Sequence, residues 1–335
     1  MKPRIDHLVF ELTEACNQRC RFCYNYWRDG RAVAPPDFSL ARKTLKRLFS
    51  QTGIGNLSFS GGEPMTVPRV LDLVLLARLK GASVNLLTNG TLLTDGDIAS
   101  LRDLGVGAVQ IPVLSADPRT HEELTGLPGS WKKATEALRL VAREMPGRAC
   151  AVLVITKANA SVIPETLDFL QDMGVTSVMV NRFNLGGTGL QHAGELVLDR
   201  AGLARAFADV ETFAAAHPAI RFTSGVCTPL CLLDPAAYPH IRFTSCSIDL
   251  SRRPVTVNYK GEVRFCNHSP RVLGNLYDRP IDEILSDPAV MAAYQGVPEP
   301  CAACPKWSRC NGGCRAAAEQ VYGSFAAIDP VLSLS

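Results

Sequence analysis

Short β-rich runs alternate with helix-like segments through the first half of this 335-residue chain. The helix-like segments carry apolar residues at three- and four-residue steps, the spacing of one buried helix face. The runs that we interpret as strands are His7–Leu12, Asn56–Ser60, Ser83–Thr88, Ala108–Leu114, Ala149–Thr156 and Ser177–Phe183. The helices expected between them are Ser39–Gln51, Pro68–Leu79, Asp95–Leu104, Ser130–Glu144 and Ser161–Met173. Six such repeats with short loops predict parallel strands, closed or partly closed by right-handed crossovers.

Twelve cysteines are distributed unevenly, with three near the start, one in the middle and eight in the last third. No export signal precedes them, and the cytosol keeps thiols reduced, so structural disulfides are not expected. The first three, Cys16, Cys20 and Cys23, follow the first predicted strand with C-x3-C-x2-C spacing. Three thiolates suit a four-iron cluster that leaves one iron free for another ligand. A zinc site is the alternative for such a pattern.

The repeat ends after a polar, glycine-rich loop at 182–189. A long helix is expected at about 199–216, a hairpin with a Lys-Gly turn at 255–265, another helix at 280–296 and a cysteine-rich block at 301–314. We therefore predict an α/β protein, a partial (β/α)6 TIM-like barrel with a smaller C-terminal cysteine-rich α+β iron–sulfur domain. The expected divisions are the barrel at 1–195, a bridging helix and linker at 196–245, the cysteine-rich domain at 246–322 and a tail at 323–335.

Composition excludes several classes of protein. The net charge of +3 is too small to indicate nucleic acid or an anionic membrane as a partner. No apolar run approaches the ~20 residues that a membrane-spanning helix needs. The start Met-Lys-Pro-Arg lacks the features of a signal peptide. We therefore expect a cytoplasmic protein.

Two further loops follow predicted strands, Gly61-Gly62-Glu63-Pro64 after the second and Thr88-Asn89-Gly90 after the third. In a parallel barrel, chemistry belongs at these strand ends. The three-cysteine loop, with aromatic Phe22 before its last cysteine, resembles the signature of the radical S-adenosylmethionine (radical SAM) enzymes. The Gly-Gly-Glu-Pro loop resembles the one with which that family contacts the methionyl amino group of its cofactor.

The resemblance implies a [4Fe–4S] cluster on Cys16, Cys20 and Cys23, with S-adenosylmethionine on the free iron. The glycines let backbone groups approach the ligand, and Glu63 supplies a carboxylate for its ammonium group. Where the family commonly has a Ser-Leu-Asp-like run, this chain has Pro112-Val113-Leu114-Ser115-Ala116-Asp117, which makes Ser115 the replacement contact. The expected cofactor-binding residues are Phe22, Gly61, Gly62, Glu63, Pro64, Thr88, Asn89, Ser115, Arg182 and Asn184. No residue is assigned as general base or hydrogen donor.

The last third of the chain resembles the SPASM extension, a C-terminal domain that carries auxiliary iron–sulfur clusters. Its cysteine pattern is matched by Cys246, Gly261 and Cys266 and then by Cys301, Cys304, Cys310 and Cys314. The resemblance implies two auxiliary [4Fe–4S] clusters. One takes Cys246, Cys266 and Cys314, completed by Cys227 or Cys231, and the other takes Cys301, Cys304 and Cys310. Taken alone, the last block also suits a structural zinc ion.

The chain departs from that pattern because no cysteine follows Cys314. The pattern usually ends in a further cysteine that gives the second auxiliary cluster its fourth ligand, near where Leu332 stands here. Three outcomes are open: an iron free for substrate, exogenous thiol or water; a substitute ligand such as Asp329 or the spare one of Cys227 and Cys231; or an incomplete, labile cluster.

The leading functional hypothesis is modification of a ribosomal peptide or protein by crosslinking, epimerisation or oxidation. The cysteine loop lies so near the N-terminus that a separate peptide-recognition protein is expected. The alternative is radical oxidation, dehydrogenation or rearrangement of a small molecule such as a sugar, an alcohol or a cofactor precursor. A third reading is a non-catalytic iron–sulfur or zinc protein. For the enzyme, an electron donor such as flavodoxin or ferredoxin is expected. The isolated histidines His121, His192 and His268 are expected at the surface or behind the metal ligands.

Overall fold

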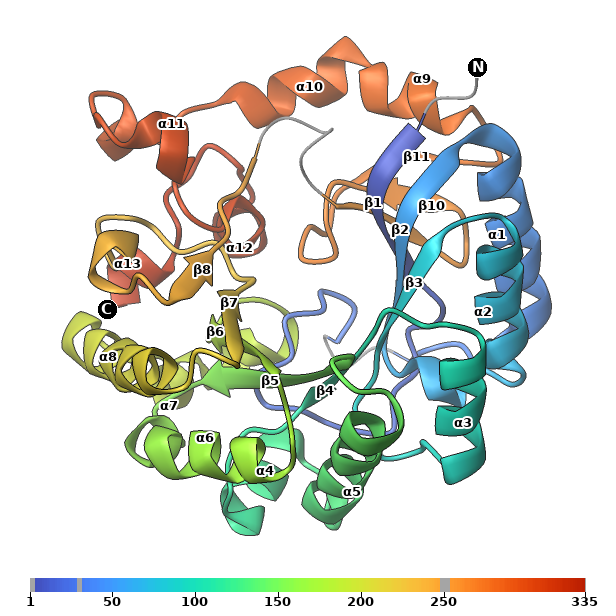
Figure 1. Ribbon diagram of the computed structural model, residues 1–335. Helices are drawn as coiled ribbons and strands as arrows, with labels where there is room; N and C mark the ends of the chain where they lie inside the picture. Colours follow the sequence, from blue (N-terminus) through green and yellow to red (C-terminus); the bar gives the residue numbers. More distant parts are fainter. Residues whose placement is uncertain (1–3, 29–31, 248–253, 335) are drawn as a thin grey trace.

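One sheet of eleven strands organises the computed structural model, which describes residues 4–28, 32–247 and 254–334. In the sheet the strands follow the order β11-β10-β9-β1-β2-β3-β4-β5-β6-β7-β8, and they curve around a central space (Figure 1). Strands β1 to β9 pair in parallel, whereas β10 and β11 are antiparallel. Their bounds are β1 Arg4–Glu11, β2 Gly53–Ser60, β3 Ser83–Leu87, β4 Ala108–Pro112, β5 Ala149–Ile155, β6 Ser177–Arg182, β7 Arg221–Ser224, β8 Ile241–Phe243, β9 Val255–Asn258, β10 Glu262–Arg264 and β11 Val272–Asn275.

Alternate side chains of each strand point to opposite faces of this sheet, as the pleat requires. In β1, Leu8 and Phe10 belong to the main hydrophobic core, while Val9 between them lines the central cavity. Strand β5 repeats the pattern, with Leu153 in the core and Val152 at the cavity. The outer face is therefore apolar and needs a cover of helices.

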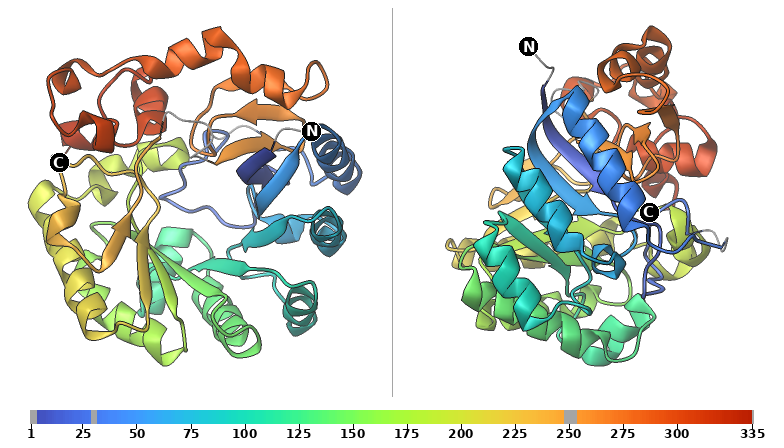
Figure 2. Two further views of the ribbon diagram at one scale, coloured as in Figure 1. Left: turned by 45° about the horizontal axis from the view of Figure 1, so that its top comes forward. Right: turned by 90° about the vertical axis from the view of Figure 1, so that its right-hand side faces the viewer.

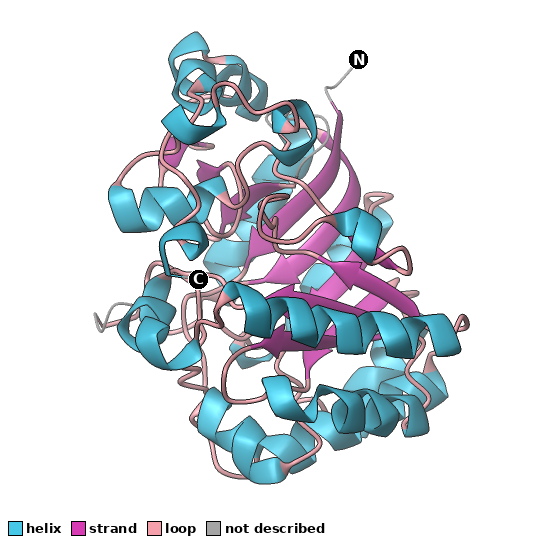
Figure 3. Cartoon of the chain, turned by 90° about the vertical axis from the view of Figure 1, so that its left-hand side faces the viewer, coloured by secondary structure: helices cyan, strands magenta, loops and turns pink. Residues whose placement is uncertain are grey.

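Helices supply that cover along the outer side of the strands, while the interior of the barrel stays free of them (Figures 1 and 3). The right-hand view of Figure 2 looks onto α1, α2 and α3, which lie in front of the first strands. The bounds are α1 Phe38–Gln51, α2 Val70–Leu79, α3 Asp95–Asp103, α4 Pro118–Thr125, α5 Ser130–Glu144, α6 Ile163–Asp172, α7 Ala193–Leu196, α8 Arg200–Ala216, α9 Ile281–Ser286, α10 Pro288–Gln295, α11 Trp307–Cys310, α12 Arg315–Tyr322 and α13 Val331–Leu334.

The fold class predicted from the sequence is confirmed, and the six expected strands and five expected helices are present with shifts of a few residues at their ends. The single helix expected at 280–296 is instead two helices, α9 and α10. Pro288 lacks the N–H that a continuous helix needs, and the side chain of Asp287 caps α10 by accepting a hydrogen bond from the Ala289 N–H.

The sheet continues beyond the six predicted strands on both sides. The region expected as a bridging helix and linker contributes α8 and also the short strands β7 and β8. On the other side, β9 of the cysteine-rich region pairs in parallel with β1. Strand pairing thus runs across the expected limits between the barrel, the linker and the cysteine-rich domain. The positions of those limits stay predictions. Across the described part of the chain, no helix combines the length and the apolar character that crossing a membrane requires.

A buried ion pair joins the first strand to the C-terminal region. The guanidinium of Arg264 in β10 contacts the carboxylate of Glu11 at the end of β1, and both side chains are almost fully buried. The Arg264 guanidinium also lies 4.9 Å from the ring centre of Tyr26 and 5.5 Å from that of Trp27. These rings belong to the loop after β1, so one arginine fixes that loop, β1 and the hairpin relative to one another.

Removing Arg264 should therefore destabilise the protein strongly. In an Arg264→Met variant Glu11 is left as an unpaired buried charge, and we expect a loss of about 3–5 kcal/mol in the free energy of unfolding. The double variant Glu11→Leu/Arg264→Met should lose less, because no charge stays buried. Urea denaturation of the apoprotein, followed by circular dichroism, measures both.

The matched control is Arg4→Met, which breaks the exposed pair between Arg4 and Asp6. Exposed pairs contribute about 0–1 kcal/mol, so this change should hardly move the urea midpoint. A loss in Arg264→Met no larger than that in Arg4→Met would contradict the structural role given to the buried pair.

Candidate active site

The loop after β1 carries Cys16, Cys20 and Cys23, and its backbone is bonded to the glycine loop after β2. The N–H of Gly62 donates to the carbonyl of Thr13 at 2.8 Å, and the N–H of Glu63 donates to the carbonyl of Ala15 at 2.8 Å. The Asn25 side chain donates to the carbonyl of Gly61 at 3.3 Å. The two loops therefore form one unit at the carboxyl ends of neighbouring strands.

Glycine is required at two positions of this contact. A Cβ atom on Gly62 would lie 2.1 Å from the Ala15 carbonyl oxygen, and one on Gly61 would lie 2.4 Å from that of Thr13. Gly61 also has φ of +129°, which side-chain-bearing residues rarely adopt. Both glycines line the cavity, and the closest partner of their backbone is the cysteine loop itself. Their contact with a cofactor stays a prediction.

A second set of backbone bonds fixes the far side of the cysteine loop. The N–H of Arg19 donates to the Thr125 carbonyl at 3.0 Å, and the N–H of Arg21 donates to the Leu124 carbonyl at 2.9 Å. Both acceptors lie at the end of α4, an element that the sequence analysis did not predict. The cysteine loop is thus held between the glycine loop and α4.

Burial raises the pKa of all three thiols in this loop, that of Cys16 to about 11. The positive charge of Arg28 opposes this effect for each thiol without outweighing it. Metal ligation requires thiolates, so binding of a cation releases these protons. Three partly buried thiols that face one cavity are a donor set for a soft metal, and they fit a cluster that itself supplies the positive charge.

The three thiols open into a cavity of about 400 Å³ at the carboxyl ends of the strands. Its walls come from the cysteine loop, the glycine loop, the inner face of the sheet and the C-terminal region. The lining residues are Val9, Cys16, Gln18, Cys20, Phe22, Cys23, Tyr24, Asn25, Ser58, Ser60, Gly61, Gly62, Leu87, Thr88, Asn89, Gln110, Pro112, Val152, Val154, Met179, Asn181, Arg182, Asn184, Gly225, Val226, Asn267 and His268. Chemistry in parallel barrels is located at this end.

Glu63 is turned toward the loop after β3. Its carboxylate accepts hydrogen bonds from Thr88 Oγ1 at 2.6 Å, from the Asn89 N–H at 2.7 Å and from the Met65 N–H at 2.9 Å. Burial raises the pKa of this carboxyl group, and the three hydrogen bonds oppose that rise. Glu63 thus holds the two loops together, while its contact with a cofactor ammonium group stays a prediction.

The remaining predicted contacts divide into those at the cavity and those behind it. Thr88 and Asn89 line the cavity, and Asn89 Nδ2 donates to Asn17 Oδ1 in the cysteine loop at 2.8 Å. Phe22 lines it too and packs against a small second hydrophobic cluster. Ser115 and Pro64 are buried outside the lining, and the Ser115 hydroxyl accepts a hydrogen bond from the Asp117 N–H.

Arg182 and Asn184, at the end of β6, connect the cavity to the C-terminal region. Arg182 Nη2 lies 2.5 Å from the carboxylate of Asp329, and both side chains are fully buried. Asn184 Nδ2 lies 3.4 Å from the sulfur of Cys314 and 3.0 Å from Nδ1 of His268. Among the described residues, Arg182 Nε and Asn184 Oδ1 are buried polar atoms without a hydrogen-bond partner. Both residues line the cavity, but these two atoms are enclosed by the protein and not open to it.

His268, expected from the sequence at the surface or behind the metal ligands, lines the cavity and was not among the predicted site residues. Its ring centre lies 3.9 Å from that of Tyr24, and its Nδ1 lies 3.8 Å from Cys314 Sγ. Burial, together with the charges of Arg182 and Arg264, lowers its pKa to about 3. The only signal in the sequence was its position two residues after Cys266, and that position does not say that the ring turns toward the barrel.

Cys227, Cys246, Cys266 and Cys314 form one group of thiols beside the cavity. A hydrogen bond with Cys246 and then burial raise the pKa of Cys227, and the charges of Cys314 and Cys266 raise it further. Burial raises the pKa of Cys314 to about 12, with smaller contributions that include Cys266 and Cys246. The four sulfurs are therefore close neighbours. Cys227, and not Cys231, is the fourth member of the group that contains Cys246, Cys266 and Cys314.

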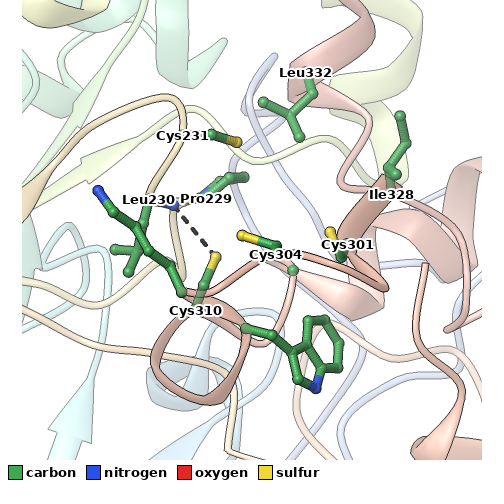
Figure 4. A pocket seen from close by; sticks show the side chains of 11 residues that line it. Pro229, Leu230, Cys231, Cys301, Cys304, Cys310, Ile328 and Leu332 are labelled. Carbon is green, nitrogen blue, oxygen red and sulfur yellow. Dashed lines mark hydrogen bonds between the residues drawn. The ribbon is translucent and has the colours of Figure 1, made fainter. Parts of the chain in front are cut away.

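Cys231, Cys301, Cys304 and Cys310 form the other group, around a small cavity of about 60 Å³ (Figure 4). Burial raises the pKa of Cys301 most, and the charges of Cys310, Cys304 and Cys231 raise it further. No three His, Cys, Asp or Glu side chains in residues 4–28, 32–247 and 254–334 are close enough to hold a single metal ion. A four-iron cube binds each ligand through a different iron, so its ligands are spaced more widely.

Two family models match the chain, one at each of these regions. The model of the Radical SAM superfamily matches residues 10–170, and that of an iron–sulfur cluster-binding domain, SPASM, matches residues 246–305. With the cysteine and glycine loops at one end of a partial barrel, this places the chain in the radical SAM superfamily, and it is a radical SAM enzyme with a C-terminal SPASM domain. The two domains imply [4Fe–4S] clusters and binding of S-adenosylmethionine.

Within the superfamily the chain is similar to proteins named PqqA peptide cyclase. The one from Streptomyces rochei is 29% identical over 335 residues, which cover 98% of this chain and 89% of that protein. The one from Gluconobacter oxydans is 28% identical over 341 residues, covering 98% of this chain and 90% of that protein.

Solved structures show the same fold at lower sequence identity. The structure of anSMEcpe with bound AdoMet has a TM-score of 0.74 at 17% identity and covers 99% of this chain and 91% of that chain. The structure of SuiB from Streptococcus suis, bound to the precursor peptide SuiA, has a TM-score of 0.73 at 18% identity, with coverage of 98% and 75%.

Substituting Gly62 should disturb the first cluster site. In Gly62→Ala the added Cβ meets the Ala15 carbonyl, so the cysteine loop has to shift away from the glycine loop. We expect the reconstituted protein to lose about four iron atoms per chain, the content of one cube, and to lose cleavage of S-adenosylmethionine. Iron and sulfide assays and product chromatography measure these losses.

Gly194→Ala is the matched control, because a Cβ there meets no atom within 4 Å. It should keep the iron content and the cleavage rate of the parent. If Gly62→Ala also kept both, the close contact between the two loops would not be what positions the cysteines.

Proposed function

We propose that this protein modifies a ribosomal peptide or protein by radical chemistry, forming a crosslink, an epimer or an oxidised side chain. The observation that carries the proposal is the junction of the three-cysteine loop, the glycine loop and the strand ends at one cavity of about 400 Å³. When bound there, a reduced four-iron cluster and S-adenosylmethionine supply a 5′-deoxyadenosyl radical that abstracts hydrogen from the substrate.

Cys16, Cys20 and Cys23 are proposed as the ligands of that cluster. Their loop is fixed on two sides by backbone hydrogen bonds, so the three sulfurs are positioned before a cluster binds. Since only three cysteines line this cavity, a cube held by them has one iron left for the amino and carboxylate groups of S-adenosylmethionine.

We further propose that the loops after β2, β3 and β6 bind S-adenosylmethionine. The backbone of Gly61 and Gly62 and the side chain of Asn89 line the cavity beside the cysteines. Arg182 and Asn184, after β6, line the same cavity and are proposed to contact the cofactor there. Glu63 acts through its hydrogen bonds to Thr88 and Asn89, which keep the loop after β3 in place.

The inner face of the sheet is proposed to receive the substrate. Ser58, Gln110 and Asn181 line it with Met179 and Val152, and no Asp, Glu or Lys of the described residues belongs to the lining. Arg182, which also lines the cavity, is already paired with Asp329. The part of the substrate that enters is therefore recognised by hydrogen bonds and apolar contact. A peptide as substrate is supported by the similarity to PqqA peptide cyclases along 98% of this chain.

We also propose two auxiliary [4Fe–4S] clusters, one for each group of four cysteines in the C-terminal region. An electron donor such as flavodoxin or ferredoxin and a separate peptide-recognition protein complete the proposed set of partners. Three thiolate-bound clusters suit a reducing compartment, and we place the protein in the cytoplasm.

The direct test uses the reconstituted, reduced protein with S-adenosylmethionine. It should release 5′-deoxyadenosine, and Cys16→Ala should release no more than a reaction without protein. With a short peptide encoded beside its gene, the mass should fall by two hydrogen atoms for a crosslink or oxidation. An epimerisation would instead show uptake of deuterium from heavy water.

Two outcomes would contradict the proposal. Equal cleavage by the parent and Cys16→Ala would reject the three-cysteine site as the site of cleavage. An unchanged peptide, together with conversion of a sugar, an alcohol or a cofactor precursor by the same sample, would reject the peptide as the substrate.

A further inference from the structure

A group of four cysteines, not three, surrounds the small cavity of the C-terminal region. Cys301, Cys304 and Cys310 come from the cysteine-rich block, and Cys231 comes from the loop after β7. Figure 4 shows the four sulfurs gathered around one space, with Ile328 and Leu332 on its other side. The N–H of Leu230 donates to Cys310 Sγ at 3.3 Å, so the loop that carries Cys231 is bonded directly to this group.

Two turns sort neighbouring cysteines into different groups. Between Cys227 and Cys231 the chain turns at Pro229, whose carbonyl accepts hydrogen bonds from the N–H groups of Leu232 and Leu233. Cys227 therefore faces the group of thiols beside the barrel, where it is hydrogen-bonded to Cys246, while Cys231 faces the small cavity.

The second turn lies between Cys310 and Cys314. The three residues between them have positive φ, +53° at Asn311, +79° at Gly312 and +82° at Gly313. A Cβ on Gly313 would lie 2.5 Å from Asp329 Oδ2, so glycine is needed there for the turn to form against Asp329. Each turn thus delivers one cysteine to each group.

Asp329, the other candidate for the missing ligand, is already engaged. Its carboxylate pairs with Arg182 and accepts hydrogen bonds from the N–H of Cys314 at 2.7 Å and from the N–H of Val331 at 3.1 Å. It is fully buried and is not part of the lining of the small cavity. Releasing it would leave the Arg182 charge buried without a partner, which is costly.

We propose that Cys231 is the fourth ligand of the second auxiliary cluster, completing the set Cys231, Cys301, Cys304 and Cys310. Leu332, near where the SPASM pattern would end in a cysteine, forms a wall of the same cavity without ligating. Cys227 then completes the first set with Cys246, Cys266 and Cys314. This assignment rests on the proposed function only in taking the bound group to be an iron–sulfur cluster.

A cluster with four thiolates has no iron free for a substrate. The second auxiliary cluster is therefore suited to electron transfer and not to substrate binding. Cys231 is exposed, whereas Cys314 of the first set is buried against the barrel cavity. The second set is thus the one nearer to solvent, where a protein electron carrier can approach it.

The test removes the Cys231 thiolate and then supplies a new thiolate from position 332, on the other side of the same cavity. In a background of Cys16→Ala/Cys20→Ala/Cys23→Ala, the two auxiliary clusters should bring about eight iron atoms per chain. Adding Cys231→Ala should lower this to about four, or leave a three-iron cluster with its own electron paramagnetic resonance (EPR) signal in the oxidised state. Adding Leu332→Cys as well should restore the parent iron content and spectrum, because position 332 lines the same cavity.

Ser333→Cys in place of Leu332→Cys is the matched control, since Ser333 is exposed and does not line the cavity. It should not restore the cluster. Cys227→Ala in the same background should change the signal of the other auxiliary cluster and leave that of the second unchanged.

A readout without substitution covers the case in which Cys231→Ala does not fold. In the holoprotein, exposed Cys231 should resist alkylation by iodoacetamide, and it should become labelled once a chelator has removed the iron. Peptide mass spectrometry measures the labelled fraction at this position.

Three results would overturn the assignment: full iron content with an unchanged spectrum in Cys231→Ala, equal labelling of Cys231 with and without iron, or stoichiometric zinc in place of the second cluster. None of these measurements requires cleavage of S-adenosylmethionine. A parent protein that fails to cleave it would therefore count against the proposed function and leave the ligand assignment standing.

Discussion

The close contact between two backbone segments, Thr13–Ala15 and Gly61–Gly62, is the constraint on which the candidate active site depends. Two adjacent strands end side by side, and their loops approach so closely that a side chain at either glycine would collide with a carbonyl oxygen. Hydrogen bonds across the contact fix the path of the cysteine loop. Glu63 extends the same unit to the loop after β3. Three thiols, a glycine loop and a polar strand end thereby share one cavity.

The C-terminal region is joined to this cavity by buried polar contacts. Arg264 pairs with Glu11 of β1, Arg182 pairs with Asp329, and Asn184 contacts both Cys314 and His268. Buried ion pairs of this kind are costly to break by removing one partner. The group Cys227, Cys246, Cys266 and Cys314 is therefore held against the wall of the cavity in which the radical chemistry is proposed. A cluster bound by these cysteines would be well placed to exchange an electron with a substrate in that cavity.

The sequence was sufficient for features that depend on local periodicity and spacing. Alternation within runs such as Ala149–Thr156 predicted the strands, since the pleat places every second residue in the core. The C-x3-C-x2-C spacing and its place after the first strand predicted a three-thiolate loop at the barrel mouth. By contrast, β7 and β8 have four and three residues, too few for a period to be visible.

Features that depend on packing between distant segments were not predictable. The need for glycine at position 62 comes from the approach of Ala15, and the place of His268 at the cavity comes from the direction in which its loop turns. The allocation of Cys227 and Cys231 was left open, because spacing alone does not say that the turn at Pro229 sends the two thiols to different sites. Three residues lie between these cysteines, and only tertiary contacts tell which group each one belongs to.

EPR spectroscopy of the fully reconstituted, reduced protein, recorded with and without S-adenosylmethionine, tests whether the cluster on Cys16, Cys20 and Cys23 binds the cofactor. The account predicts signals from three clusters, of which the cofactor changes only one, because only the cluster on Cys16, Cys20 and Cys23 has an iron without a thiolate. The same addition should change no signal in Cys16→Ala/Cys20→Ala/Cys23→Ala. A cofactor-dependent change that persists in that variant, or none in the parent, would contradict the account.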